Sequence, residues 1–322
     1  MDWLPFVSSN SIKFRGCNLR RDAPPLAIKC DTLILQSNEN TVKGFENDLQ
    51  IFKHYCIIVQ RWIMKVAVIT GASQGIGNAI AKKFSENGYR VFNLSRTPAE
   101  GIESIKTDVS DRENVFASIG EVVKRAGRID VLVNNAGFGI SGAVEDTDES
   151  AVRKIFDVNY FGTLFATQAV IPVMRENGGG TIINMSSAGA PLSLPFQSFY
   201  SCTKSAVSSL SEALRIELKP FNIKVSTILP GDVKTEFTAR REKNKSNSVY
   251  YGERIDKSVE KMERDEQNGM SPSVIAKIAL KIAKSKNPPV YVVGGASYKL
   301  LVGLSKILPK RLVVWAIGKL YG

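Results

Sequence analysis

The sequence predicts an α/β protein with a doubly wound parallel sheet, because short runs rich in Val and Ile alternate with amphipathic stretches of helical period. The runs KVAVIT and VLVNNAG show no polar–apolar alternation, and strands of that kind are buried on both faces, as in a parallel sheet covered by helices. A glycine-rich turn joins the first run directly to a helical stretch. These observations predict one large α/β domain.

The elements follow one another in a regular order. We expect strands at 65–70, 89–94, 131–137, 181–187, 224–231 and 289–295, and helices at 76–86, 112–126, 156–175, 197–218 and 272–283. The stretch between Arg96 and Asp108 is too short for a crossover helix plus a strand, so one unit lacks its helix. Ser271 and Pro272 are typical of the start of a helix. This arrangement is the Rossmann type of sheet.

Three parts can be distinguished along the chain. Residues 64–296 form the predicted nucleotide-binding catalytic domain, including a charged, exposed lid at 236–270. Residues 1–63 show neither the helical nor the strand period of apolar residues, and we expect a poorly ordered N-terminal extension. Met64 directly precedes the first strand, so this extension either is an upstream addition or belongs to the functional protein. Residues 297–322 form a basic, amphipathic tail, which Pro309 divides into pieces too short to span a membrane.

Composition and charge exclude several kinds of site. The chain has 43 Lys and Arg against 31 Asp and Glu, a net charge of +12, and the surplus lies mostly after residue 240. No aromatic-interleaved basic patch accompanies it, so we expect no nucleic-acid partner. His54 is the only histidine, which excludes histidine triads and histidine-ligated metals from the main domain. The four cysteines lack CxxC spacing, so we expect no metal site and a reducing, cytoplasmic location.

The first strand runs into the turn TGASQGIG, from Thr70 to Gly77, at the start of a helix. Glycines there let the backbone approach a pyrophosphate, whose charge the helix N-terminus stabilises. The spacing is G-x3-G-x-G, which differs from the general G-x-G-x-x-G dinucleotide pattern. The turn predicts a dinucleotide site, and a glycine-rich turn without a ligand is the alternative.

The end of the second strand favours NADP(H) over NAD(H). Ser95 and Arg96 offer a hydroxyl and a guanidinium to a 2′-phosphate, where a carboxylate would instead bind a ribose diol. An exposed loop arginine is the alternative. Turns at 134–137 and 230–235 follow two further strands at the same edge of the sheet, where they could contact the dinucleotide. The alternative is that each is a plain turn whose side chains only satisfy local backbone groups.

Tyr200 is the predicted acid/base. Lys204 lies four residues further on, so in a helix its ammonium shares a face with the phenol and should lower the tyrosine pKa. Ser187 ends a strand thirteen residues earlier, so its hydroxyl and the phenol can meet over one carbonyl oxygen. The alternatives are that Ser187 caps a turn, with Ser186 in its place, and that Asn159 is a satisfied buried amide.

Together these motifs resemble the short-chain dehydrogenase/reductase family. TGASQGIG, NNAG, DVNYFG, a serine pair ahead of YSCTK, and PGDVKT occur in family order. The amino-acid sequence that flanks these motifs is most similar to the 17β-hydroxysteroid-dehydrogenase-like members of the family. Gln74 departs from the pattern, because many NADP-preferring members carry Arg or Lys there.

The resemblance implies a role for each matching residue. Tyr200 would donate a proton to the substrate oxygen, and Ser187 would orient that oxygen. Lys204 would bind the nicotinamide ribose, and Asn159 would hold a water linking Lys204 to solvent. The residues expected to contact NADP(H) are Gly71, Ser73, Gln74, Gly75, Ile76, Gly77, Ser95, Arg96, Asp108, Val109, Asn135, Ala136, Gly137, Tyr200, Lys204, Pro230, Gly231, Val233 and Thr235.

The sequence therefore predicts an NADP(H)-dependent oxidoreductase that interconverts a carbonyl and an alcohol by direct hydride transfer. A steroid-, retinoid- or lipid-like substrate is expected, and the family resemblance implies a homodimer or homotetramer. A non-catalytic NADP(H)-binding regulator on the same scaffold is the alternative. A sugar-nucleotide epimerase fits less well, because those relatives usually show TGxxGxxG. The tail either lies on a membrane surface or packs on the domain or a subunit.

Overall fold

The computed structural model describes residues 64–244 and 250–322. The expectations for the N-terminal extension at 1–63, including His54, lie outside the described residues.

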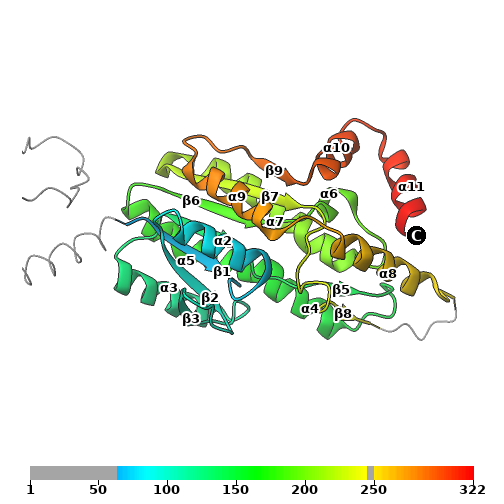
Figure 1. Ribbon diagram of the computed structural model, residues 1–322, viewed down its shortest axis with the longest axis horizontal. Coiled ribbons are helices and arrows are strands. Elements are labelled where there is room, and N and C mark those ends of the chain that lie inside the picture. Colours follow the sequence, from blue (N-terminus) through cyan, green and yellow to red (C-terminus); the bar gives the residue numbers. More distant parts are fainter. Residues whose placement is uncertain (1–63, 245–249) are drawn as a thin grey trace, which may run out of the picture. The chain divides into compact units, whose positions relative to one another are not determined.

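A seven-stranded parallel sheet forms the centre of the domain (Figure 1). Its spatial order is β3 (Glu103–Lys106), β2 (Arg90–Ser95), β1 (Val66–Thr70), β4 (Val131–Asn134), β6 (Gly180–Met185), β7 (Ile223–Pro230) and β9 (Tyr291–Gly294). Every neighbouring pair is parallel, which confirms the doubly wound sheet. The order reverses between β1 and β4, and ligands of such sheets bind at the carboxyl ends near that point.

Helices cover both faces of the sheet. They are α2 (Gly75–Ser85), α3 (Arg112–Ala126), α5 (Gly162–Glu176), α7 (Ser198–Glu217), with the short η2 (Lys219–Phe221) after it, and α9 (Pro272–Lys284). Val68 of β1 belongs to the core cluster under α3 and α5, whereas its neighbour Ile69 belongs to the cluster under α2 and α9. Successive strand residues point to opposite faces, so both faces of β1 need apolar side chains. This explains the uninterrupted apolar run in the sequence.

The predicted helix at 156–175 is wrong in its start and in its regularity. The chain is already helical in α4 (Glu149–Phe156), and a π-helical turn, η1 (Asp157–Phe161), connects α4 to α5. Within α4 only Ile155 is buried. The apolar spacing therefore becomes visible only after α4, which is why the sequence pattern misses it.

The shortened unit is confirmed. Strand β3 follows β2 with no helix between them, and the two strands pair directly from Phe92↔Glu103 to Ser95↔Lys106. The remaining predicted helices and strands are present with ends shifted by a few residues, as is usual for element boundaries.

The segment predicted as an exposed lid is partly packed. It contains β8 (Glu242–Lys243), which pairs with β5 (Ile140–Ser141), and the helix α8 (Arg254–Gln267). Ile255, Val259 and Met262 of α8 are buried, so one face of this charged helix serves as core. At its end the Ser271 hydroxyl accepts a hydrogen bond from the Ser273 amide and caps α9, as predicted.

The C-terminal tail forms two helices, α10 (Ala296–Ser305) and α11 (Lys310–Tyr321), and Pro309 is the N-cap of the second (Figure 1). Val302 and Val313 are their buried residues, and they pack near the short helix α6 (Gly189–Leu192). Among the described residues, no helix combines the length and the hydropathy needed to cross a bilayer. The tail therefore packs on the domain in this structure, by one narrow face.

Candidate active site

A cleft of about 640 Å³ lies at the carboxyl ends of the central strands. Its wall includes every residue expected to contact the dinucleotide, from Gly71 in the first turn to Thr235 after β7. It also includes Ser187, which the dinucleotide set does not contain. The structure thus brings together residues that lie far apart in the sequence. Of the expected site residues only Asn159 does not line the wall.

In the glycine-rich turn at one end of the cleft, two residues have the left-handed backbone conformation, which residues other than glycine adopt only with strain. Gly71 and Gly75 have φ values of 67° and 55°. A Cβ at Gly77 would lie 2.3 Å from the Gly71 carbonyl oxygen and 2.5 Å from Asn135 Nδ2, so helix α2 could not start so close to the sheet. The N-cap residue Gln74 makes no side-chain capping bond. The first turn of α2 therefore presents amides that suit a phosphate.

The ends of β2 and β3 form the next part of the wall. Arg96 is exposed, whereas the Ser95 hydroxyl already donates a 2.5 Å hydrogen bond to the Thr97 carbonyl oxygen. The pKa of Asp108 is lowered, first by a hydrogen bond from the Ser110 hydroxyl and to a smaller extent by the charge of Arg96. Asp108 is therefore a carboxylate at neutral pH. The free guanidinium of this region is that of Arg96, and it suits an anionic group on a bound nucleotide.

The asparagine doublet after β4 has a clear structural role. Asn135 Nδ2 donates to the carbonyl oxygens of Thr70 and Gly71, at 3.0 and 3.1 Å. The Asn134 amide is buried and donates to Asn184 Oδ1 at 2.9 Å. The doublet thus ties β4 to β1 and β6, and Asn135 does this while facing the cleft.

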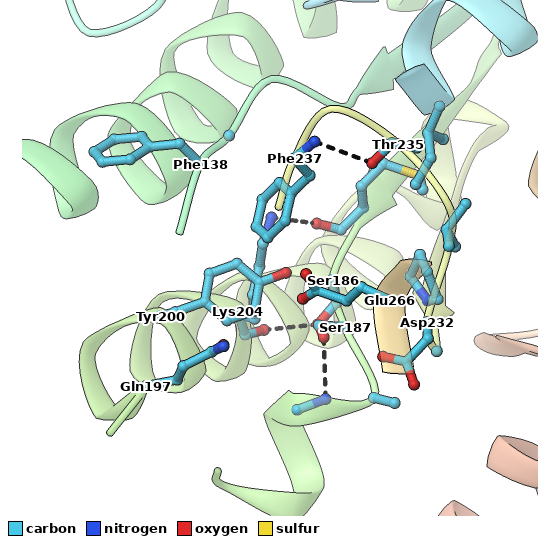
Figure 2. Close-up of a pocket in the computed structure, with 18 of the residues that line it drawn as sticks. Phe138, Ser186, Ser187, Gln197, Tyr200, Lys204, Asp232, Thr235, Phe237 and Glu266 are labelled. Carbon is cyan, nitrogen blue, oxygen red and sulfur yellow. Dashed lines mark hydrogen bonds between the residues drawn. The ribbon is translucent and has the colours of Figure 1, made fainter. Parts of the chain in front are cut away.

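Tyr200 and Lys204 lie one turn apart near the start of α7, and Ser187 lies just after β6 (Figure 2). Burial raises the pKa of Tyr200 to about 12, while a hydrogen bond with the Ser187 hydroxyl acts in the opposite direction. The same hydroxyl accepts from the Gly189 amide at 3.0 Å, which orients it. Phenol and hydroxyl therefore meet at one point, as the spacing predicts.

The expected lowering of the Tyr200 pKa is not found in the protein alone. The Lys204 ammonium lies 5.8 Å from the centroid of the tyrosine ring and donates to the Met185 carbonyl oxygen at 2.9 Å. Burial lowers the pKa of Lys204 itself to about 8. Desolvation raises the pKa of the phenol by more than the Ser187 hydrogen bond and the Arg241 charge lower it, so Tyr200 is protonated at neutral pH.

Asn159 lies in the π-helical turn and is fully buried. Its amide is satisfied by Phe138, whose N–H donates to Oδ1 and whose carbonyl accepts from Nδ2, both at 3.0 Å. It lies behind the wall near Lys204, because a Cβ at Gly137 would contact both Asn159 Oδ1 and Lys204 Nζ, at 2.9 and 3.4 Å. The side chain therefore behaves as the satisfied amide that was the alternative. A π-turn at this point is a feature that often marks functional sites.

The turn after β7 connects the cleft to the tail. The Tyr298 hydroxyl of α10 hydrogen-bonds to Asp232, and the Tyr298 ring covers Gly231 so closely that a Cβ there would lie 1.9 Å from Cδ2. Burial raises the pKa of Asp232. Val233 is bridged to Met270 at the end of the lid segment. Two separate parts of the chain, α10 and the end of the lid segment, thus contact this turn.

Several wall residues were not predicted from the sequence. Phe237 places its ring 5.7 Å from that of Tyr200 (Figure 2). Gln197 reaches Met262, with Nε2 2.9 Å from the sulfur. The Gln197 spacing of three residues before Tyr200 is a helical signal that could have identified it. The tail also contributes an apolar wall, formed by Leu301, Leu304, Leu308, Leu312, Val313, Ala316, Ile317 and Leu320.

Comparison with known proteins gives one clear family. The family described as short chain dehydrogenase matches residues 65–246. A 3-ketodihydrosphingosine reductase of Bacteroides thetaiotaomicron is 37% identical over 263 residues, which cover 80% of this chain and 98% of that protein. The similarity to this relative thus extends over more residues than the family match.

Solved structures agree with the fold. A short-chain dehydrogenase from Streptomyces avermitilis has a TM-score of 0.70 at 32% identity and covers 79% of this chain and 96% of its own. A 3-ketoacyl-(acyl-carrier-protein) reductase from Brucella melitensis, solved with NADH, has a TM-score of 0.60 at 27% identity and covers 72% and 98%. Other neighbours were solved with NADP or with NAD.

Proposed function

This chain belongs to the short-chain dehydrogenase/reductase family of oxidoreductases, and on that basis we propose that it reduces a lipophilic ketone with NADPH. The observation that carries the proposal is the meeting of Ser187 and Tyr200, with Lys204 one turn away, on the wall of the cleft. The other end of the same cleft holds the glycine-rich turn and the uncapped start of α2. Acid/base groups and a dinucleotide cradle therefore share one space.

The residues present fit a nicotinamide dinucleotide. The positive φ values of Gly71 and Gly75, and the lack of room for a Cβ at Gly77, let a pyrophosphate approach the backbone. Lys204 and Val233 line the same cleft, and in this proposal they would bind the nicotinamide ribose and the carboxamide, respectively. When bound, the cofactor supplies the hydride.

The chain's own groups handle the proton. Tyr200 is protonated, so it can give its phenolic proton to the substrate oxygen as negative charge develops there. The Ser187 hydroxyl donates a hydrogen bond to the same oxygen and fixes its position. The Lys204 ammonium, one turn away, stabilises the tyrosinate left behind. Lys204 is buried, and Ser187 and Tyr200 are half-buried on the cleft wall, so a bound substrate would cover them and exclude water from the step.

NADP(H) is the preferred cofactor in this proposal. Arg96 is exposed on the cleft wall, and no carboxylate follows the end of β2 to bind a ribose diol. Neighbouring structures include both dinucleotides, so the preference rests on this guanidinium. Ser95 contributes less, because its hydroxyl is already bonded to Thr97.

The substrate class follows from the far wall of the cleft. Leucines of α10 and α11, together with Leu194 and Met262, form an apolar surface beyond the acid/base groups. An apolar wall of this extent suits a long hydrocarbon chain. The Bacteroides thetaiotaomicron relative is named as a 3-ketodihydrosphingosine reductase, so we propose a long-chain β-keto lipid rather than a steroid. The narrower resemblance to 17β-hydroxysteroid-dehydrogenase-like members stays a prediction.

A carbonyl screen tests the proposal. The full chain is incubated with NADPH, and in parallel with NADH, and each of a long-chain 3-keto lipid, a steroid ketone, retinal and a fatty aldehyde. Loss of reduced-cofactor absorbance should be fastest with NADPH and the keto lipid. Tight NADPH binding without turnover on any carbonyl would instead support the regulator that uses the same scaffold.

A further inference from the structure

The C-terminal helix pair, α10 and α11, exposes an unusual amount of apolar surface. More than half of the exposed large hydrophobic side chains in the described part of the chain lie between Leu300 and Leu320. Ile307 is 82% exposed and Trp315 63% exposed, and each stands away from the cleft wall. Exposed large apolar side chains gathered on one short segment mark a candidate interaction surface.

The charges on the helix pair are all of one sign. Residues 296–322 contain Lys299, Lys306, Lys310, Arg311 and Lys319 and no Asp or Glu. All five are exposed, and the apolar side chains lie between them in sequence. Leucine and tryptophan interspersed with long cationic side chains are typical of helices that lie in the plane of a membrane interface.

The mouth of the cleft lies in the same surface. Leu304, Leu308 and Leu312 line the cleft and are also 41%, 42% and 50% exposed. A side chain that both lines a cleft and faces outward marks its rim. The rim nearest the helix pair is therefore apolar, and exposed cations precede and follow these leucines in the sequence.

We propose that α10 and α11 dock on an anionic lipid bilayer, and that the cleft receives its lipid substrate through this apolar rim. The docking stands on the exposed side chains and charges alone, whereas the delivery of substrate rests on the function proposed above. Cations beside an apolar face are complementary to anionic headgroups above a hydrocarbon layer. A second copy of the chain is the poorer occupant, because pairing this face with itself brings like charges together.

Co-sedimentation with vesicles tests the docking without any enzyme assay. The full chain is mixed with vesicles of phosphatidylcholine, and with vesicles that also contain phosphatidylglycerol. We expect binding to the anionic vesicles that weakens with added salt, and little binding to the neutral ones. Each Lys→Gln or Arg→Gln change among Lys306, Arg311 and Lys319 should reduce the partition coefficient about fivefold.

The apolar contribution is tested with a matched pair of variants. I307S/W315S removes two exposed side chains of the helix pair that do not line the cleft, so the fold and the site are retained. I216S/V144S removes two side chains of similar exposure, 76% and 56%, from elsewhere on the domain. Only the first variant should lose vesicle binding, by about tenfold or more.

Three outcomes would overturn the proposal. These are absence of the full chain from sedimented anionic vesicles, equal loss of binding in the two double variants, and a dimer in sedimentation analysis that I307S/W315S dissociates. The delivery step is tested separately, by measuring the rates of NADPH oxidation with a keto lipid held in vesicles and with a short water-soluble ketone. I307S/W315S should slow the first reaction and leave the second unchanged. Equal rates for the first reaction in the variant and the parent chain would refute delivery, whereas no turnover in the parent would count against the proposed function itself.

Discussion

The Tyr298 hydroxyl, in the first turn of α10, donates a hydrogen bond to the Asp232 carboxylate, in the turn that follows β7. This contact ties the C-terminal helix pair to the turn after β7, which lines the cleft. Both groups are partly buried, and burial raises the pKa of Asp232, so the hydrogen bond satisfies a carboxylate that has lost part of its hydration.

Tyr298→Phe removes that hydrogen bond and keeps the ring that covers Gly231. We expect the free energy of unfolding to fall by about 1–3 kcal/mol, because the Asp232 carboxylate loses its partner. Urea titration followed by circular dichroism measures the change. Tyr160→Phe, which keeps the ring contact with Phe161 and lies outside the cleft wall, is the control and should change little. Equal stability of the Tyr298 variant and the parent would show that the contact contributes nothing.

Tyr200→Phe tests the acid. Removal of the phenolic hydroxyl should reduce kcat by about 10²-fold or more, because no other group replaces the proton donor. NADPH affinity, measured by cofactor fluorescence, should remain close to that of the parent. A variant that retains more than about a tenth of the parent rate would contradict the assignment.

The pH dependence of reduction should follow Lys204. Its pKa of about 8 means that the ammonium is present below that pH and is lost above it. The phenol of Tyr200, with a pKa of about 12, keeps its proton throughout this range. Values of kcat/KM for NADPH should therefore be level at neutral pH and fall as the pH rises through about 8. Lys204→Arg keeps its charge, so whatever activity it retains should not fall in that range. A level profile in the parent up to high pH would exclude Lys204 as the controlling group.

Arg96→Gln tests the cofactor preference. If the guanidinium binds the 2′-phosphate, its loss should weaken NADPH about 10- to 100-fold and leave NADH nearly unchanged. The ratio of the two dissociation constants gives the answer. Arg112→Gln, at another exposed arginine outside the cleft, serves as the control. Parallel weakening of both cofactors would indicate that Arg96 affects the loop rather than the phosphate.

Gly77→Ala and Gly120→Ala separate packing from helix propensity. A Cβ at Gly77 would meet Gly71 O at 2.3 Å, whereas nothing lies within 4 Å of a Cβ at Gly120. The first change should lower the free energy of unfolding by about 1–3 kcal/mol and weaken NADPH binding. The second should be neutral or raise that free energy by up to about 1 kcal/mol, since alanine favours the helix. Thermal unfolding measures the stability of the two variants. A Gly77→Ala variant at least as stable as the Gly120→Ala variant would contradict the prediction.

Local patterns were sufficient for much of the fold and for the acid/base pair. Each of these patterns lies within a few neighbouring residues: the apolar run of β1, the glycines that follow it, and the spacing of Tyr200 and Lys204. The partner of the Asn159 amide was not predictable, because its hydrogen bonds are with Phe138, about twenty residues earlier in the chain. The raised pKa of Tyr200 depends on burial by distant segments, which the sequence does not display.

The tail shows the same limit. Its leucines at 301, 304, 308 and 312 have helical spacing, and the sequence predicted an amphipathic segment. Which surface that segment covers is decided by Val302 and Val313, which pack near Ala188 and Leu192. Such long-range pairing gives no signal within either segment, so the apolar wall of the cleft could not be predicted.

Tyr200 and Lys204 lie on a twenty-residue helix anchored in the core, whereas the walls beyond them come from α8, α10 and α11 at the periphery. Mutations can therefore accumulate in these outer helices and reshape that part of the cleft while Tyr200 and Lys204 keep their positions. Substrate preference could therefore change through substitutions in α8, α10 or α11 separately, without loss of activity at the intermediate stages.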